Sequence, residues 1–157
     1  MRLRNRNVRS NLDADCVPLD ETERLVRSRL KRSIRSAARS LVLDVDDAFA
    51  LALIGVASWG ELVTRLTQKF EDGLNWCDPD AFHIDHRLPI ALFDTNSLFQ
   101  LHACFFHENL FPIDWRANLK KGSRVCLETK RAYLKKLRPQ WARNPVFRNI
   151  DKLFVLE

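Results

Sequence analysis

The chain has 157 residues, which suits one domain with extensions, and 46% of them are hydrophobic, which excludes wholesale disorder. The formal net charge of +6 is unevenly distributed. Residues 1–39 carry eleven Lys or Arg against five Asp or Glu, residues 40–118 four against twelve, and residues 119–157 eleven against three. Two basic ends therefore flank an acidic middle. Such ends either hold a polyanion backbone or are solvated helix faces, and charge alone does not decide between the two.

The cysteines and the apolar segments narrow the cellular setting. Cys16, Cys77, Cys104 and Cys126 include no Cys-x-x-Cys pair, so structural zinc is not expected. The Arg-rich N-terminus lacks the apolar segment of a secretion signal, and the longest apolar run, residues 48–57, is too short to cross a bilayer. We therefore expect an intracellular protein, cytoplasmic or nucleoid-associated, with reduced cysteines and no membrane contact.

The first third of the chain is expected to be helical and basic. Residues 1–20 have the composition of a flexible basic arm, and residues 21–74 form a helical region. Apolar residues recur at helical spacing from Leu25 to Leu41, and arginine and lysine fill the other positions. This pattern predicts an amphipathic helix that Asp20 or Thr22 caps. Its apolar stripe faces a core, and its cations face solvent or phosphates; a helix on a membrane surface has similar chemistry.

The next two helices are predicted from their boundary residues. Aspartates precede an apolar segment over residues 48–54 that Gly55 ends, as acidic residues suit a helix start and glycine a helix end. A third helix is expected over residues 59–71.

The second half of the chain alternates short elements. We expect a strand over residues 82–90 with a bend near Pro89, a short helix capped by Thr95 or Asn96, and a second strand over residues 109–113. A short helix over residues 115–121 and a last basic helix over residues 123–137 follow. The fold class is therefore α+β. Residues 75–125 form the functional core, and residues 126–157 form a basic C-terminal helix and tail.

The chemistry concentrates in three short motifs of this core. They are His83-Ile84-Asp85-His86-Arg87-Leu88-Pro89, then Asn109-Leu110-Phe111-Pro112, then Asn118-Leu119-Lys120-Lys121-Gly122. A carboxylate and an amide oxygen are hard ligands that suit Mg²⁺ or Mn²⁺. A histidine that does not bind the metal can take a proton from water near neutral pH, and nearby lysines can hold a phosphate. The set indicates a metal-dependent phosphodiesterase site.

These motifs, in this order, resemble those of the HNH, or ββα-metal, endonuclease family, and most of all the small phage-type members. The resemblance covers roughly residues 25 to 125 and also includes Leu53-Ile54-Gly55, Gln68-Lys69-Phe70 and Gly73-Leu74-Asn75-Trp76. The chain departs from the family pattern at Phe82, where Trp is usual, at Leu74, where Met is usual, and at Arg87, where an aliphatic residue is usual. Arg87 lies beside the site and could alter substrate preference.

The resemblance implies a fold and a role for each site residue. The fold is a β-hairpin and short helix flanked by basic N- and C-terminal helices. Asp85 and Asn118 would bind the metal, Mg²⁺ or else Mn²⁺, and His86 would be the general base. Asn109 would orient the finger loop and His86 without touching metal. His83, Arg87, Lys120 and Lys121 would contact phosphate or DNA. Taken singly, each of these residues also suits a structural role: a turn aspartate, a packed histidine, a helix-cap amide or a solvated lysine.

The resulting expectation is an endonuclease that hydrolyses phosphodiester bonds in DNA, duplex DNA above all, by nicking or by cutting both strands. Neighbouring residues of a regular strand point to opposite faces, so Asp85 and His86 can serve one phosphate only where the strand bends or where they flank it. The alternative is a nucleic-acid-binding protein that keeps the fold without cleaving. The sequence leaves the oligomeric state open.

Overall fold

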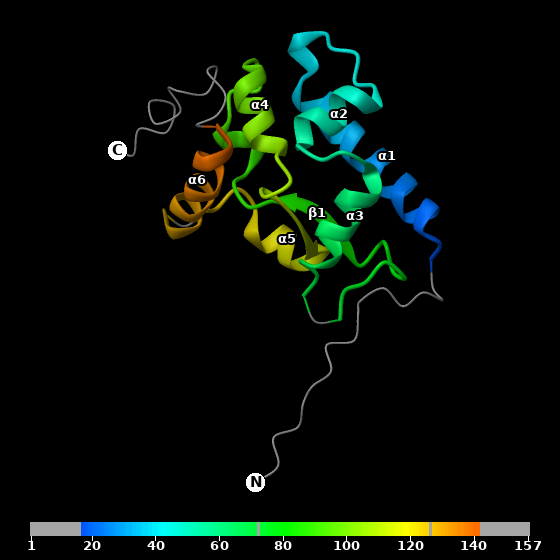
Figure 1. Cartoon of the computed structure of the whole chain (residues 1–157). Coiled ribbons are helices and arrows are strands. Elements are labelled where there is room, and N and C mark those ends of the chain that lie inside the picture. The colour runs from blue at the N-terminus through cyan, green and yellow to red at the C-terminus, as the bar shows by residue number, and fades with distance from the viewer. Residues whose placement is uncertain (1–16, 72, 126, 142–157) are drawn as a thin grey trace.

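The computed structural model describes residues 17–71, 73–125 and 127–141. It shows a mixed α+β fold in which helices surround one two-stranded antiparallel sheet (Figure 1). Its elements run in this order: α1 Leu19–Ala37, a 3₁₀ turn Arg39–Leu41, α2 Asp47–Ile54, α3 Trp59–Thr67, β1 Phe82–His86, a 3₁₀ turn Ile90–Leu92, α4 Leu98–Phe105, β2 Leu110–Asp114, α5 Trp115–Lys121 and α6 Leu127–Trp141.

The basic amphipathic helix is confirmed as α1, but its expected cap is wrong. The helix begins at Leu19, directly after Pro18, so Asp20 and Thr22 lie inside its first turn. Proline fixes φ near −65° and is therefore suited to a helix start. Residues 19 and 20 of the predicted arm are helical for the same reason, and residues 1–16 of the arm lie outside the described residues. The apolar stripe, Val26, Leu30 and Ile34, is buried as expected.

Helices α2 and α3 follow their sequence signals closely at their starts. The Asp46 carboxylate accepts the backbone N–H of Phe49 at 2.7 Å, and the Ser58 hydroxyl accepts that of Glu61 at 3.1 Å. Gly55 ends α2 with φ +76°. Helix α3 stops at Thr67, earlier than the predicted residue 71. The chain turns away there because the Lys69 ammonium donates to the carbonyls of His107 and Leu110, at 2.6 and 2.9 Å.

The stretch Asp47–Thr67 is also long and apolar enough to cross a membrane by length and composition alone. The fold divides it into α2 and α3, and both helices bury apolar side chains in the core. Core helices of soluble proteins show the same pattern.

The sheet is shorter than the sequence predicted. Strand β1 pairs with β2 from Phe82 opposite Asp114 to His86 opposite Leu110. The strand predicted to reach residue 90 ends at His86. The Arg87 N–H still donates to the Asn109 carbonyl, but the Leu88 N–H binds the Asn109 side chain and Pro89 has no N–H to donate. Helix α4 is present but Ser97 caps it, not Thr95 or Asn96. The expected α5 is confirmed at both ends.

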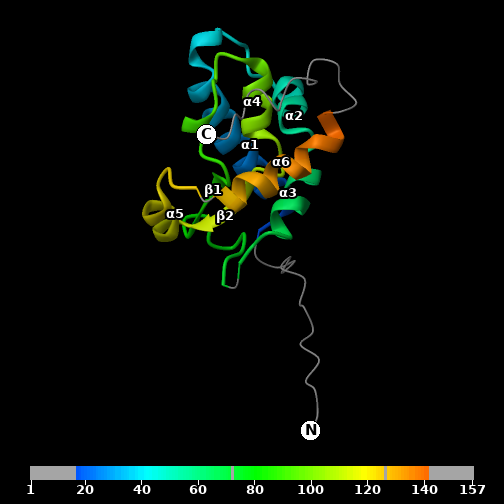
Figure 2. The ribbon, with the colours of Figure 1, turned by 90° about the vertical axis from the view of Figure 1, so that its left-hand side faces the viewer.

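The hairpin lies between two layers. Helix α5 contacts both strands on one side, and α3 contacts β2 on the other side (Figure 2). The core-facing side chains of β1 include Phe82, which is fully buried and packs edge-on against Phe70 and Trp76. The opposite face of the strand carries His83 and Asp85, because successive strand residues alternate. The topology thus directs two of the predicted site residues toward α5.

Two further expectations need correction. The last helix, α6, begins at Leu127 and runs to Trp141, so Pro139 lies within it instead of following it. Cys104 is a buried free thiol, as expected, but Cys77 is disulfide-bonded, so the expectation of four reduced cysteines is wrong.

Candidate functional site

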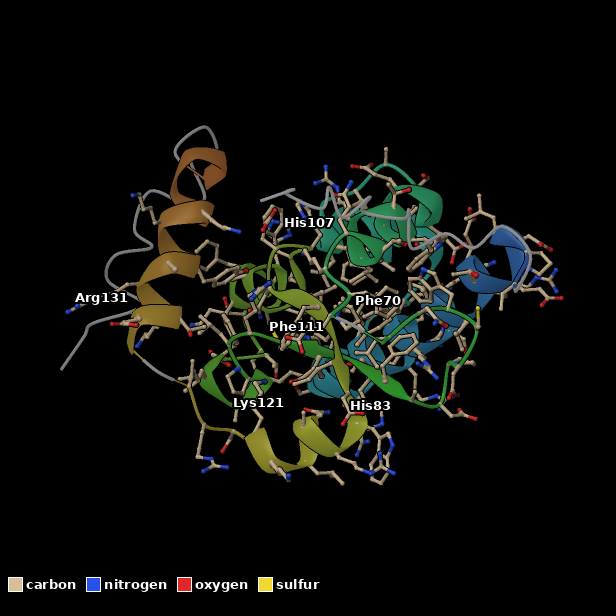
Figure 3. The ribbon with its side chains drawn as sticks, turned by 90° about the horizontal axis from the view of Figure 1, so that it is seen from below. Phe70, His83, His107, Phe111, Lys121 and Arg131 are labelled. Carbon is tan, nitrogen blue, oxygen red and sulfur yellow. The ribbon has the colours of Figure 1, made fainter. Side chains whose placement is uncertain are left out.

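Two polar pairs join β1 to α5 and form the centre of the site. The Asn118 Nδ2 lies 3.0 Å from the His83 Nδ1, and the Lys121 Nζ donates to the Asp85 Oδ2 at 2.5 Å. Residues 83 and 85 share one strand face, and residues 118 and 121 are three apart on a helix and share one helix face. The two pairs are therefore neighbouring rungs of a ladder between the strand and the helix, and Figure 3 shows His83 and Lys121 near opposite ends of α5.

The Lys121 rung is the more enclosed of the two. Its ammonium also donates to the His86 carbonyl at 2.7 Å and lies 5.6 Å from the centre of the Phe111 ring. The side chains of Lys121 and Asp85 are each only 20% exposed. Such a pair is worth more than a solvent-screened one, because water competes less for the charges.

The predicted metal ligands Asp85 and Asn118 lie on different rungs of this ladder. Both project into the space between β1 and α5, but each is paired with a neighbour instead of with a shared partner. Among the described residues no three His, Cys, Asp or Glu side chains form a cluster that could hold a metal ion. Mg²⁺ is commonly held by only one or two carboxylates, with water and phosphate oxygens completing the shell. The Asp85 and Asn118 oxygens fit this donor set once Lys121 releases the carboxylate.

The predicted general base His86 faces away from the ladder. Its residue exposure is 5%, and its ring packs edge-on against Phe105 of α4 at 5.0 Å between centres. Burial lowers the pKa of His86 to about 4, and the nearby Asp85 carboxylate offsets this only in part. Its Nε2 is buried and finds no hydrogen-bond partner in the described part of the chain. Strand β1 stays regular through His86, so the bend that would bring Asp85 and His86 to one phosphate is not seen.

The buried Asn109 holds the connection between the two strands. Its Oδ1 accepts the backbone N–H of Leu88 at 2.8 Å, and its Nδ2 donates to the carbonyls of Leu88 and Cys104 at 3.1 and 2.8 Å. Its own carbonyl accepts the backbone N–H of Arg87 at 2.8 Å. The side chain therefore uses three of its four hydrogen-bonding positions to fix the segment that follows β1.

The remaining predicted phosphate contacts differ in accessibility. Lys120 is exposed on α5. Arg87 is half-buried, with its guanidinium 5.1 Å from the Phe111 ring centre and its Nε buried without a partner among the described residues. The structure thus places His83, Asp85, Asn118 and Lys121 together, whereas the Arg87 guanidinium packs on the Phe111 ring and Lys120 is exposed on α5.

A hollow of about 390 Å³ opens beside the His83–Asn118 rung, and α1 supplies its other wall. Its lining residues are Arg29, Leu30, Ser33, His83, Ile84 and Asn118. Sequence reasoning did not single out Arg29 or Ser33. The available signal was their four-residue spacing, which places both on one face of the helix, but nothing local shows that this face meets β1.

Comparison of the chain with protein-family models, with curated proteins and with solved structures gives no match in any of the three. The functional argument therefore depends on the residues and on their geometry.

Proposed function

We propose that this chain is a metal-dependent endonuclease of the HNH type that hydrolyses phosphodiester bonds in DNA. The observation that supports the proposal is the β1–α5 ladder: a carboxylate, an imidazole, an amide and a lysine gather between an antiparallel hairpin and the helix that directly follows it. These are the residue types that bind a hard divalent cation, take a proton and hold a phosphate.

In this proposal Asp85 and Asn118 would hold Mg²⁺ or Mn²⁺. When bound, such a cation supplies a Lewis acid that stabilises charge on the phosphate. Two other side chains of the chain would bind the phosphate and keep the site in shape. Lys121 would leave Asp85 for a phosphate oxygen, keeping its positive charge within the site, and the buried Asn109 would keep the β1–β2 connection in place.

The proton acceptor is the role for which sequence motif and geometry point to different residues. The motif assigns it to His86, which is buried against Phe105. His83 is exposed and lines the hollow, and its Nδ1 is held by Asn118. A general base must lie within hydrogen-bond reach of the water that it deprotonates. Because the Asn118 Nδ2 donates to the His83 Nδ1, the neutral ring carries its proton on Nε2, and Nδ1 is the atom that can accept one. We therefore assign proton acceptance to the His83 Nδ1, which would be freed when Asn118 turns to the cation.

A second function is favoured by one specific observation. Each polar group of the ladder already has a partner within the chain, and the Asp85 charge is balanced by Lys121. A protein that binds nucleic acid without cleaving it would show such internal neutralisation. Its affinity would come from Lys and Arg contacts to phosphates and would fall steeply with salt.

Plasmid nicking separates the two functions. The endonuclease should convert supercoiled plasmid to nicked or linear forms with Mg²⁺ or Mn²⁺, and chelation should stop it. The variant Asp85→Asn keeps the shape of the side chain but loses its charge, and should abolish nicking while DNA binding in chelator persists. Wild-type protein that binds DNA but never nicks it, at any concentration of either metal, would establish the binding function.

A further inference from the structure

The hollow beside His83 lies along the free edge of β1, and α1 closes it. In a two-stranded sheet β1 has one edge without a strand partner, and Arg29 of α1 reaches this edge. Its guanidinium donates to the Phe82 carbonyl at 3.3 Å and to the Pro79 carbonyl at 2.7 Å. The helix is thereby fixed against the strand, so its side chains become part of the site wall.

The lining of the hollow is suited to an anion. Arg29 is its one cationic residue, and no carboxylate is among its lining residues. A guanidinium has five N–H donors, so two carbonyl bonds leave others for a ligand. The Ser33 hydroxyl lies one helical turn further along α1, and His83 and Asn118 supply polar groups from the opposite wall. The acidic charge that acts on Arg29 is that of Asp80, which lies outside the lining.

The other basic surface of α1 is a weaker candidate. It is a groove lined by Arg24, Arg27, Ser28, Lys31, Arg32 and Arg35. Several of these cations are already paired: Arg24 with Asp20 at 2.5 Å, and Arg27 and Lys31 with Asp47 at 2.7 and 2.8 Å. The carboxylates neutralise part of the groove, whereas the hollow keeps its cation without a carboxylate in its wall.

We propose that the hollow between α1, β1 and α5 receives a backbone phosphate of the nucleic acid, adjacent to the bond that the ladder would cut, and that Arg29 and Ser33 are its binding residues. This inference rests on the proposed nucleic-acid substrate. It makes α1 part of the substrate site. Arg29 has a double role, since it anchors the helix to the strand edge and presents its remaining donors to the phosphate.

Three serines on α1 provide a matched test. Ser33→Asp puts a carboxylate into the hollow, Ser28→Asp puts one into the basic groove, and Ser36→Asp puts one on an exposed position outside both. The three variants have the same net charge and the same helix-propensity cost. Binding of a short fluorescein-labelled DNA duplex is measured by anisotropy in EDTA, where no cleavage interferes, over a series of salt concentrations.

We expect Ser33→Asp to weaken DNA binding about tenfold. The introduced carboxylate would repel the phosphate at contact distance in a half-enclosed site, which lowers an association constant by a factor on the order of ten. The negative slope of log K against log salt should become shallower by about 0.9, the value for one lost phosphate contact on duplex DNA. Ser28→Asp and Ser36→Asp should each change affinity less than about threefold, because a charge distant from the phosphate is screened. Circular dichroism confirms that the helix content is retained.

A second variant covers the case in which Ser33→Asp fails to fold. Arg29→Gln keeps an amide donor for the Pro79 carbonyl but removes the charge, and should give the same loss of salt slope. The inference is overturned if Ser33→Asp binds as well as Ser36→Asp, if Ser28→Asp weakens binding most, or if the wild-type protein does not bind the duplex.

The same measurements separate this inference from the proposed function. Ser33-dependent binding without metal-dependent nicking would retain the phosphate site and refute the endonuclease. Nicking with equal binding by all three serine variants would retain the endonuclease and refute the phosphate site.

Discussion

The two histidines of β1 offer the sharpest test of the proposed chemistry. His83→Gln retains an oxygen that can accept from the Asn118 amide, but it removes the imidazole that could take a proton. His86→Leu replaces a buried ring with an apolar side chain that can still pack against Phe105. The pair therefore removes each candidate base while leaving the local contacts largely in place.

The expected magnitudes follow from burial. His83 is exposed, so His83→Gln should change the free energy of unfolding by less than about 0.5 kcal/mol. Losing a general base costs about 10²–10⁴ in rate, which corresponds to about 3–5 kcal/mol of transition-state stabilisation. His86→Leu removes a buried nitrogen that has no partner among the described residues, and an unpaired buried polar atom costs about 1–3 kcal/mol. This variant should therefore be at least as stable as the wild type and should nick normally.

The assay is the observed rate of plasmid nicking with protein in excess and saturating Mg²⁺, together with urea unfolding of each variant at one pH. The reasoning is refuted if folded His86→Leu loses nicking by two decades or more while His83→Gln nicks at the wild-type rate. That outcome would mean that β1 rearranges when DNA binds, so that His86 leaves its place against Phe105.

Three further predictions concern stability. Burial lowers the pKa of both His86 and His107 to about 4, from an ordinary value of 6.5. Their contribution to the free energy of unfolding is therefore complete above pH 6.5 and is lost as pH falls toward 4. At about 1.4 kcal/mol per pH unit for each proton, urea unfolding at pH 5 should show a loss of about 4 kcal/mol, and His86→Leu should halve this loss. Asn109→Ala leaves three buried backbone groups without their hydrogen-bond partner and should lower the free energy of unfolding by about 2–4 kcal/mol. The loss should appear as a lower urea midpoint at constant slope, and an unchanged midpoint would contradict this prediction. Gly55→Ala places a Cβ 2.6 Å from the buried Phe106 ring at φ +76°, whereas the Cβ of Gly73→Ala, at φ +91°, meets open space. Thermal melts should therefore show that the free energy of unfolding falls by about 2–4 kcal/mol for the first variant and by only about 1 kcal/mol for the second. Equal losses would count against the close contact.

Local signals in the sequence were sufficient to predict the helix and the strands around the site. Helix α5 could be predicted at both ends, and the position of the hairpin to within a few residues, because turn and cap residues act over three or four positions. The same signals placed the end of β1 four residues too late. The side chain that ends the pairing, Asn109, comes from the far end of the connection, and its bond to the Leu88 N–H cannot be read from the segment itself.

The arrangement of the site depended on packing between distant elements. The alternation of strand residues already indicated that Asp85 and His86 face opposite ways. The sequence could not show that the His86 side is filled by α4, nor that Lys121 is the group that meets Asp85. The wall supplied by Arg29 and Ser33 was missed for the same reason, since more than fifty positions separate Arg29 from Phe82, whose carbonyl it binds.

The connection between β1 and β2 has a consequence for engineering. The pairing of the strands is fixed at its base by one amide side chain, so no tight turn is needed at its tip to set the register. Within the tip, Ala91, Leu92, Asp94 and Asn96 are exposed. Exposed loop tips are the places where chains best accept inserted sequence. A tag or a reporter peptide inserted at the tip should therefore leave the register of the hairpin intact, and the protein could be labelled there without a change at the ladder.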